Sequence, residues 1–114
     1  CILVFHLNFI YMAISQQRLD ELKIKYTGAS RLDIPVGDND EIETLIIRRL
    51  DRVTYKAMIS LMEKDDLLAC ATTLRALTVE GDADKVCNDF EALRTAQNLL
   101  VEVITPKTGN VAKL

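Results

Sequence analysis

Residues 31–49 carry the pattern that most restricts the fold, because apolar and polar side chains alternate over residues 31–36 and a turn separates this run from a second one. The apolar positions of the first run are Leu32, Ile34 and Val36. This alternation is the period of a half-buried strand, and Pro35 within it indicates the edge of a sheet. Residues 37–41 have turn composition, and residues 42–49 read as a second strand. The sequence therefore predicts a β-hairpin.

Helical periodicity flanks the predicted hairpin on both sides. Before the hairpin, residues 15–26 read as a helix that Ser15 can cap. After the hairpin, apolar residues recur mostly at gaps of 3 and 4, and Gly81-Asp82 and Thr105-Pro106 break the pattern. The predicted helices there cover residues 51–64, 65–77 and 84–104. We therefore expect an α+β fold with an N-terminal helix, a β-hairpin and then a bundle of about three helices.

The first residues of the chain differ in composition from the rest. Residues 1–11 contain no Asp, Glu, Lys or Arg, and Met12-Ala13 resembles a translation start. We interpret residues 1–11 as an apolar leader that is doubtful as part of the fold, either upstream read-through or a fragment end. The alternatives are a truncated membrane or secretion signal and a native element packed on the domain. Residues 12–105 are then a single α+β domain, and residues 106–114 are a flexible tail.

The length and net charge of the chain exclude several classes of protein. The chain has 114 residues, 49% of them hydrophobic, which suits one globular domain. A net charge of −3 is a poor match to bulk nucleic acid or an anionic membrane. No apolar run reaches the roughly 20 residues of a membrane span. The three cysteines are too few and odd in number for a disulfide framework, so we expect reduced thiols and a cytoplasmic protein.

Chemical motifs are sparse. The single histidine, His6, lies in the doubtful leader, which weakens any pairing of it with a serine or cysteine nucleophile. Cys70 and Cys87 lie 17 positions apart with no histidine between them, unlike a zinc site, and no segment has the register of a calcium loop. A carboxylate pair for acid–base chemistry stays open among 17 acidic residues, but nothing selects one. We expect no enzyme, no metal and no cofactor.

Two groups of residues are candidates for partner binding. A basic cluster at the junction between the second strand and the next helix can contact phosphate or an acidic partner, and as a simpler alternative it is a solvated face paired with nearby acids. Its members are Arg48, Arg49, Arg52 and Lys56. Met58 and Met62 add adaptable side chains to a wide apolar stripe, which serves either the core or a partner helix.

The order of these pieces resembles a known family. Residues 44–58, TLIIRRLDRVTYKAM, form a strand that ends in basic residues and runs directly into a helix. Residues 74–82, LRALTVEGD, are a Leu-rich helix end followed by Gly-Asp, and residues 21–28, ELKIKYTG, are an opening helix and its stop. Together they resemble small phage and prophage proteins of the tail assembly chaperone type over about residues 19–104. Leu50 and Thr78 depart from the family pattern, which often has proline and an aromatic residue there.

The resemblance implies a non-enzymatic protein in the cytoplasm of an infected host, without a cofactor. Such chaperones are thought to coat the tape-measure protein and recruit tail-tube subunits through exposed apolar helix surface. Arg49 and Arg52 match the family's junction. The alternatives are a structural virion or head–tail completion protein, and a small nucleic-acid-binding regulator that uses the basic junction. Among partners, a protein is favoured over nucleic acid, self-association stays open, and no membrane is expected.

Overall fold

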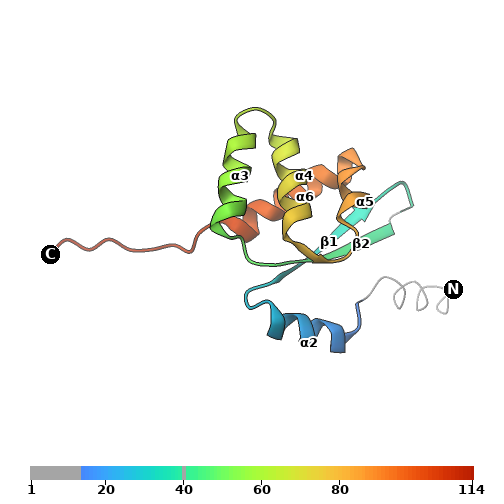
Figure 1. Cartoon of the computed structure of the whole chain (residues 1–114), viewed down its shortest axis with the longest axis horizontal. Coiled ribbons are helices and arrows are strands. Elements are labelled where there is room, and N and C mark those ends of the chain that lie inside the picture. Colours follow the sequence, from blue (N-terminus) through green and yellow to red (C-terminus); the bar gives the residue numbers. More distant parts are fainter. Residues whose placement is uncertain (1–13, 40) are drawn as a thin grey trace.

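A computed structural model describes residues 14–39 and 41–114, and the predictions for residues 1–11 lie outside this range. Figure 1 shows a small sheet with helices on both of its faces. In chain order the elements are α2 (Gln16–Lys25), β1 (Ser30–Val36), β2 (Glu41–Ile47), α3 (Arg52–Met62), α4 (Asp66–Leu77), β3 (Thr78–Glu80), α5 (Ala83–Cys87) and α6 (Phe90–Ile104). The predicted α+β class is confirmed.

Each described helix begins at a residue whose side chain accepts a hydrogen bond from a backbone N–H three positions later. This arrangement satisfies one of the N–H groups that a helix start leaves without a partner. The capping residues are Ser15, Asp51, Asp65, Asp82 and Asp89. The short polar side chains in the sequence therefore set where the helices start.

The predicted hairpin is confirmed, and a third strand joins it. β1 and β2 pair antiparallel from Ser30↔Ile47 to Val36↔Glu41, with Gly37 at φ 73° in the turn. β3 pairs antiparallel with the other edge of β2, giving the order β1-β2-β3. Gly81 follows at φ 101°, where a Cβ atom would clash with the carbonyl oxygen of Thr44, so this turn requires glycine.

Two details of the predicted helical half are wrong. β3 was not predicted as a strand, although residues 78–80 extend the sheet. Residues 84–104, predicted as one helix, form α5 and α6, because Asp89 caps a new helix start. The predicted end of the last helix at Thr105-Pro106 is confirmed.

The core lies between one face of the sheet and helices α4–α6. Alternate residues of β1 and β2 point into it, and α4, α5 and α6 supply the opposite side. Its fully buried members include Ile34, Leu45, Ile47, Leu74, Leu77 and Val86. On the other face of the sheet, Leu22 of α2 and Ile46 are nearly fully buried and line the same recess. Figure 1 shows α2 on the side of the sheet away from α3–α6.

Residues 106–114 contain no helix or strand and extend away from the body in Figure 1. Their flexibility stays a prediction, as does the single-domain assignment of residues 12–105. Within the described residues, no helix has the length and apolar character needed to cross a membrane.

Candidate functional site

The fold separates the four members of the basic cluster, and the Arg48 side chain is used in contacts that hold the fold together. The Arg48 Nη1 atom donates to Asp51 Oδ2 at 2.6 Å, and Nη2 donates to the carbonyl oxygen of Ala76 at 3.2 Å. The backbone N–H of Arg48 donates to the carbonyl oxygen of Leu77 at 2.9 Å. Arg48 thus joins the end of β2 to the start of α3 and the end of α4, and these bonds leave it less free for a partner.

Asp51 is the carboxylate at the centre of this junction. Its Oδ1 accepts from the backbone N–H of Thr54 at 2.7 Å, and its Oδ2 accepts from Arg48. The hydrogen bonds from Thr54 first, and then the one from Arg48, lower the pKa of Asp51 from 3.8 to about 2. The carboxylate is therefore ionised at neutral pH and holds the first turn of α3 in place.

The other three cations of the junction are exposed, and the structure does not bring them all together. The Arg49 guanidinium lies over Gly28, where a Cβ atom would be 2.7 Å from Arg49 Nε. Arg52 and Lys56 lie one turn apart on the exposed side of α3. Within residues 14–39 and 41–114, none of the three forms an ion pair. Arg52 and Lys56 are thus available to a partner, and Arg49 lies on the connection between α2 and β1.

Met58 and Met62 lie together in an apolar groove. Met58 is buried, and Met62 is 49% exposed. The groove has a volume of about 90 Å³ and opens to solvent. Its walls come from α3 and α6, and its floor comes from α4. The lining residues are Met58, Met62, Asp66, Ala69, Cys70, Thr73, Gln97, Leu100, Val101 and Ile104. We refer to this set as the apolar groove.

The groove exists because large side chains on two helices face small ones on a third. α3 and α6 both pack on α4 but make little contact with each other. The floor of α4 offers only Ala69, Cys70 and Thr73 there, so the space above it is not filled. At one end the Gln97 side chain donates from Nε2 to Asp66 Oδ2 at 3.3 Å. The result is a recess that a further apolar side chain can enter.

Two polar atoms on the floor of the groove differ in their hydrogen bonding. Cys70 Sγ donates to the carbonyl oxygen of Leu93 at 3.9 Å, and burial raises its pKa to about 11, so the thiol stays protonated at neutral pH. Thr73 is 1% exposed, and its Oγ1 has no hydrogen-bond partner in the described structure. A buried hydroxyl without a partner is uncommon, because it has given up its bonds to water.

The sequence found only the α3 side of this groove. Leu100, Val101 and Ile104 of the opposite wall are not among the candidate residues chosen from the sequence, although Val101 is 59% exposed. The signal that could have located the floor is the run of small residues Ala69, Cys70 and Ala71 between two helices rich in large apolar residues.

The described part of the chain contains no group of three His, Cys, Asp or Glu side chains placed to hold a metal ion. Scanning the chain against protein-family models gave no match, and searches of the curated proteins and of the solved structures found no match either.

Proposed function

We propose that this chain is a non-enzymatic protein-binding protein of the phage or prophage tail assembly chaperone type, acting on tape-measure and tail-tube proteins. The observation that carries the proposal is the apolar groove between α3, α4 and α6. A groove of this kind is suited to a helical segment that inserts an apolar side chain. The family resemblance over about residues 19–104 supplies the identity of the partner.

Binding energy in the groove comes from apolar side chains on its two walls. Met62 and Val101 are both largely exposed, so a partner that covers them removes apolar surface from water. Met58 and Met62 have flexible thioether side chains, which adapt to partners of different shape. A chaperone that covers successive segments of a long protein requires such tolerance of sequence.

The floor of the apolar groove adds one polar feature that a bound side chain can use. The unpartnered Oγ1 of Thr73 gains a hydrogen bond when the inserted side chain carries a polar tip that can reach it. Asp66 is engaged by Gln97, and the Cys70 thiol is protonated, so neither is set up as a base or a nucleophile. These features support binding as the task of the groove.

The proposal is tested by affinity capture of the full chain from the native host while tail proteins are being made, with identification by mass spectrometry. Two matched variants are compared with the natural chain. Val101→Asp puts a charge on the groove wall, and Val53→Asp puts the same charge on an exposed face of α3 outside the groove, where Val53 is 79% exposed. Circular dichroism is used to check that both variants are folded.

We expect the natural chain and Val53→Asp to recover a tape-measure protein or tail-tube subunit, and Val101→Asp to recover at least about tenfold less, because a buried unpaired charge opposes binding. Equal recovery by Val101→Asp, or recovery of neither partner by the natural chain, contradicts the proposal. The chaperone is also expected to be missing from finished particles. Its presence there in fixed ratio to tail subunits supports the structural virion protein instead.

The exposed cations Arg49, Arg52 and Lys56 favour a second candidate, a small nucleic-acid-binding regulator. Salt weakens contacts between cations and phosphates because binding releases counterions, and the slope is set by the few phosphates contacted. Fluorescence anisotropy with a labelled duplex at low salt tests this candidate. Binding that weakens in Arg52→Gln and Lys56→Gln supports it, and the lack of any binding at low salt rules it out.

A further inference from the structure

The apolar groove contains two polar side chains whose bonding capacity the described part of the chain leaves unused. Asp66 lines the groove and accepts a hydrogen bond from the neutral amide of Gln97 at 3.3 Å, but it forms no ion pair within residues 14–39 and 41–114. A neutral amide does not balance the charge of a carboxylate. Thr73 lines the floor, is 1% exposed, and has no hydrogen-bond partner for its Oγ1 in the described structure. Both groups can therefore take a contact from a molecule that enters the groove.

The two groups are held at a fixed spacing along α4. Asp66 and Thr73 lie seven positions apart in one continuous helix, which corresponds to two turns and about 10 Å along its axis. Residues seven apart lie on the same face of a helix, as the position of both in the lining shows. A second helix that lies along α4 presents its own residues at the same spacing of seven.

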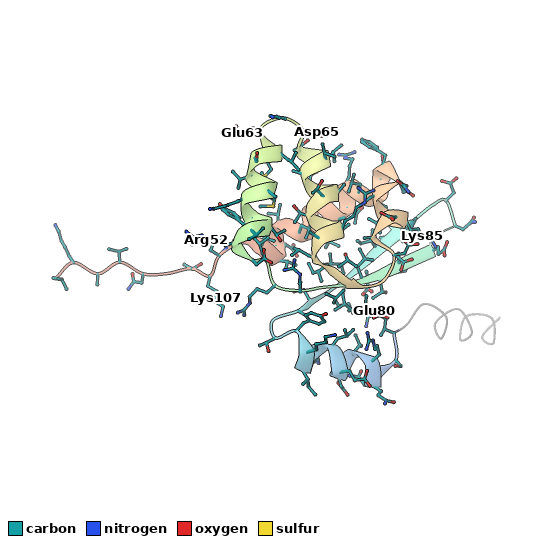
Figure 2. The ribbon with its side chains drawn as sticks, in the orientation of Figure 1. Arg52, Glu63, Asp65, Glu80, Lys85 and Lys107 are labelled. Carbon is teal, nitrogen blue, oxygen red and sulfur yellow. The ribbon has the colours of Figure 1, made fainter. Side chains whose placement is uncertain are left out.

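The walls of the groove follow α4, so an elongated partner can contact both groups at once. α3 and α4 pack against each other and run in opposite directions, because only a short connection joins them. Figure 2 shows Glu63 and Asp65 of this connection at one end of both helices. Met62 therefore lies at the connection end of the groove, and Met58 lies one turn further along, toward Thr73.

We propose that the apolar groove recognises an amphipathic helix in which a lysine or arginine lies seven residues from an inserted side chain with a polar tip. The cation pairs with Asp66, and the polar tip bonds to the hydroxyl of Thr73. Apolar residues between them cover Met62 and Val101, which are 49% and 59% exposed. This inference rests on the proposed function, because it takes the groove as the binding site for a protein partner and adds the chemistry of the bound segment.

The experiment is fluorescence anisotropy of labelled helical peptides with the full chain at low salt. The first peptide, of about 18 residues, has glutamine at the inserted position, apolar residues at gaps of three and four, and lysine seven residues from the glutamine. The second replaces this lysine by glutamine. The third has the lysine five residues from the inserted position, on another face of the helix. We expect the first peptide to bind about three- to fivefold more tightly than the other two, because it alone forms the ion pair.

Variants of the chain locate the contact. Asp66→Asn removes the charge and keeps an acceptor for Gln97, so the preference for the first peptide should disappear. Glu63→Gln is the matched control, since it removes the same charge from the neighbouring connection but does not line the groove, and the preference should remain. Thr73→Val should weaken all three peptides alike, because each carries the same inserted glutamine. Circular dichroism is used to check that the variants are folded.

Three outcomes overturn the inference: no binding of any peptide up to about 1 mM, equal Kd values for the first two peptides, or a preference that survives Asp66→Asn. Sedimentation equilibrium of the chain alone adds a fourth, because a dimer that Val101→Asp dissociates would mean that a second copy occupies the groove. The peptides contain no tail-protein sequence. A lysine preference without capture of a tail protein therefore contradicts only the proposed function, and capture without a lysine preference contradicts only this inference.

Discussion

At the scale of single residues, two buried threonines show how one hydroxyl stabilises the fold while another does not. Thr44 Oγ1 donates to Asp33 Oδ1 at 2.7 Å across the hairpin, whereas Thr73 Oγ1 has no partner in the described structure. Both side chains are buried. Comparing the two residues therefore distinguishes the free energy that a hydrogen bond contributes from the cost of burying a polar atom that has no partner.

We predict that Thr73→Val stabilises the protein by about 1 kcal/mol, because the isosteric methyl group removes an unsatisfied hydroxyl from the interior. Thr44→Val is the matched control and should destabilise by about 1 kcal/mol, since Asp33 Oδ1 loses one of its two donors and keeps only Arg31 Nε. Urea unfolding followed by circular dichroism measures both changes. A loss of stability in Thr73→Val would show that the hydroxyl has a partner after all. The same variant should bind the partner of the groove less tightly.

At the scale of the elements, α2 is the helix with the fewest ties to the rest of the fold. Leu22 is its one buried residue, and Arg18 connects it to Glu80 of β3 through an ion pair of 2.9 Å. The space that it shares with the sheet has a volume of about 240 Å³, so its packing there is loose. Weak packing of this kind allows an element to open without unfolding the domain.

We predict that Leu22→Ala releases α2 from the sheet, lowering its local opening free energy by about 2 kcal/mol, because the only buried apolar anchor is lost. Hydrogen exchange measured by mass spectrometry should then show faster exchange in residues 16–25 and unchanged protection in α4. Ile24→Ala is the control, since Ile24 is exposed and its truncation should alter neither. Equal acceleration in α2 and α4 would mean that α2 and the core unfold as one unit.

Local patterns predicted the hairpin, α2, α3 and α4, because their periodicity and capping residues lie within each segment. β3 could not be predicted in this way. Its three residues, Thr78–Glu80, become a strand only because β2 presents a free edge beside them. The break between α5 and α6 likewise depends on Asp89, which accepts from Ala92 in its own helix and from distant Gly37.

The same difference between local patterns and distant contacts decides which residues of the candidate site could be predicted. Met58 and Met62 could be selected from their own helix, since flexible apolar residues on a wide stripe suit a partner as well as a core. Pairing of Arg48 with a nearby acid was one of the two interpretations of the basic cluster, and Asp51 is that acid, but the contact of Arg48 with the carbonyl oxygen of Ala76 could not be predicted because Ala76 is distant in the sequence. Val101 becomes part of the groove only when α6 is placed opposite α3.

At the scale of the whole molecule, two helix-capping aspartates also connect segments distant in the sequence or in the fold. Asp89 Oδ2 accepts from the backbone N–H of Gly37 at 2.8 Å, which joins the hairpin turn to the start of α6. Asp51 caps α3 and holds Arg48, which in turn contacts the end of α4. Protonation of either carboxylate therefore weakens two things together, the cap at the start of a helix and a contact between two elements.

We predict that acid destabilises the protein through these two carboxylates. Hydrogen bonds from Thr54 lower the pKa of Asp51 from 3.8 to about 2, and bonds from Gly37 and Ala92 also lower the pKa of Asp89. A carboxylate whose pKa is lower in the folded chain than in the unfolded chain stabilises the fold at pH values above its unfolded pKa. Stability should therefore be full above about pH 4 and fall toward pH 2 as the carboxylates of the folded chain bind protons. Asp51→Asn and Asp89→Asn keep a capping side chain but cannot titrate, so urea midpoints of the double variant should vary less over this window. An unchanged slope would place the acid sensitivity in other groups.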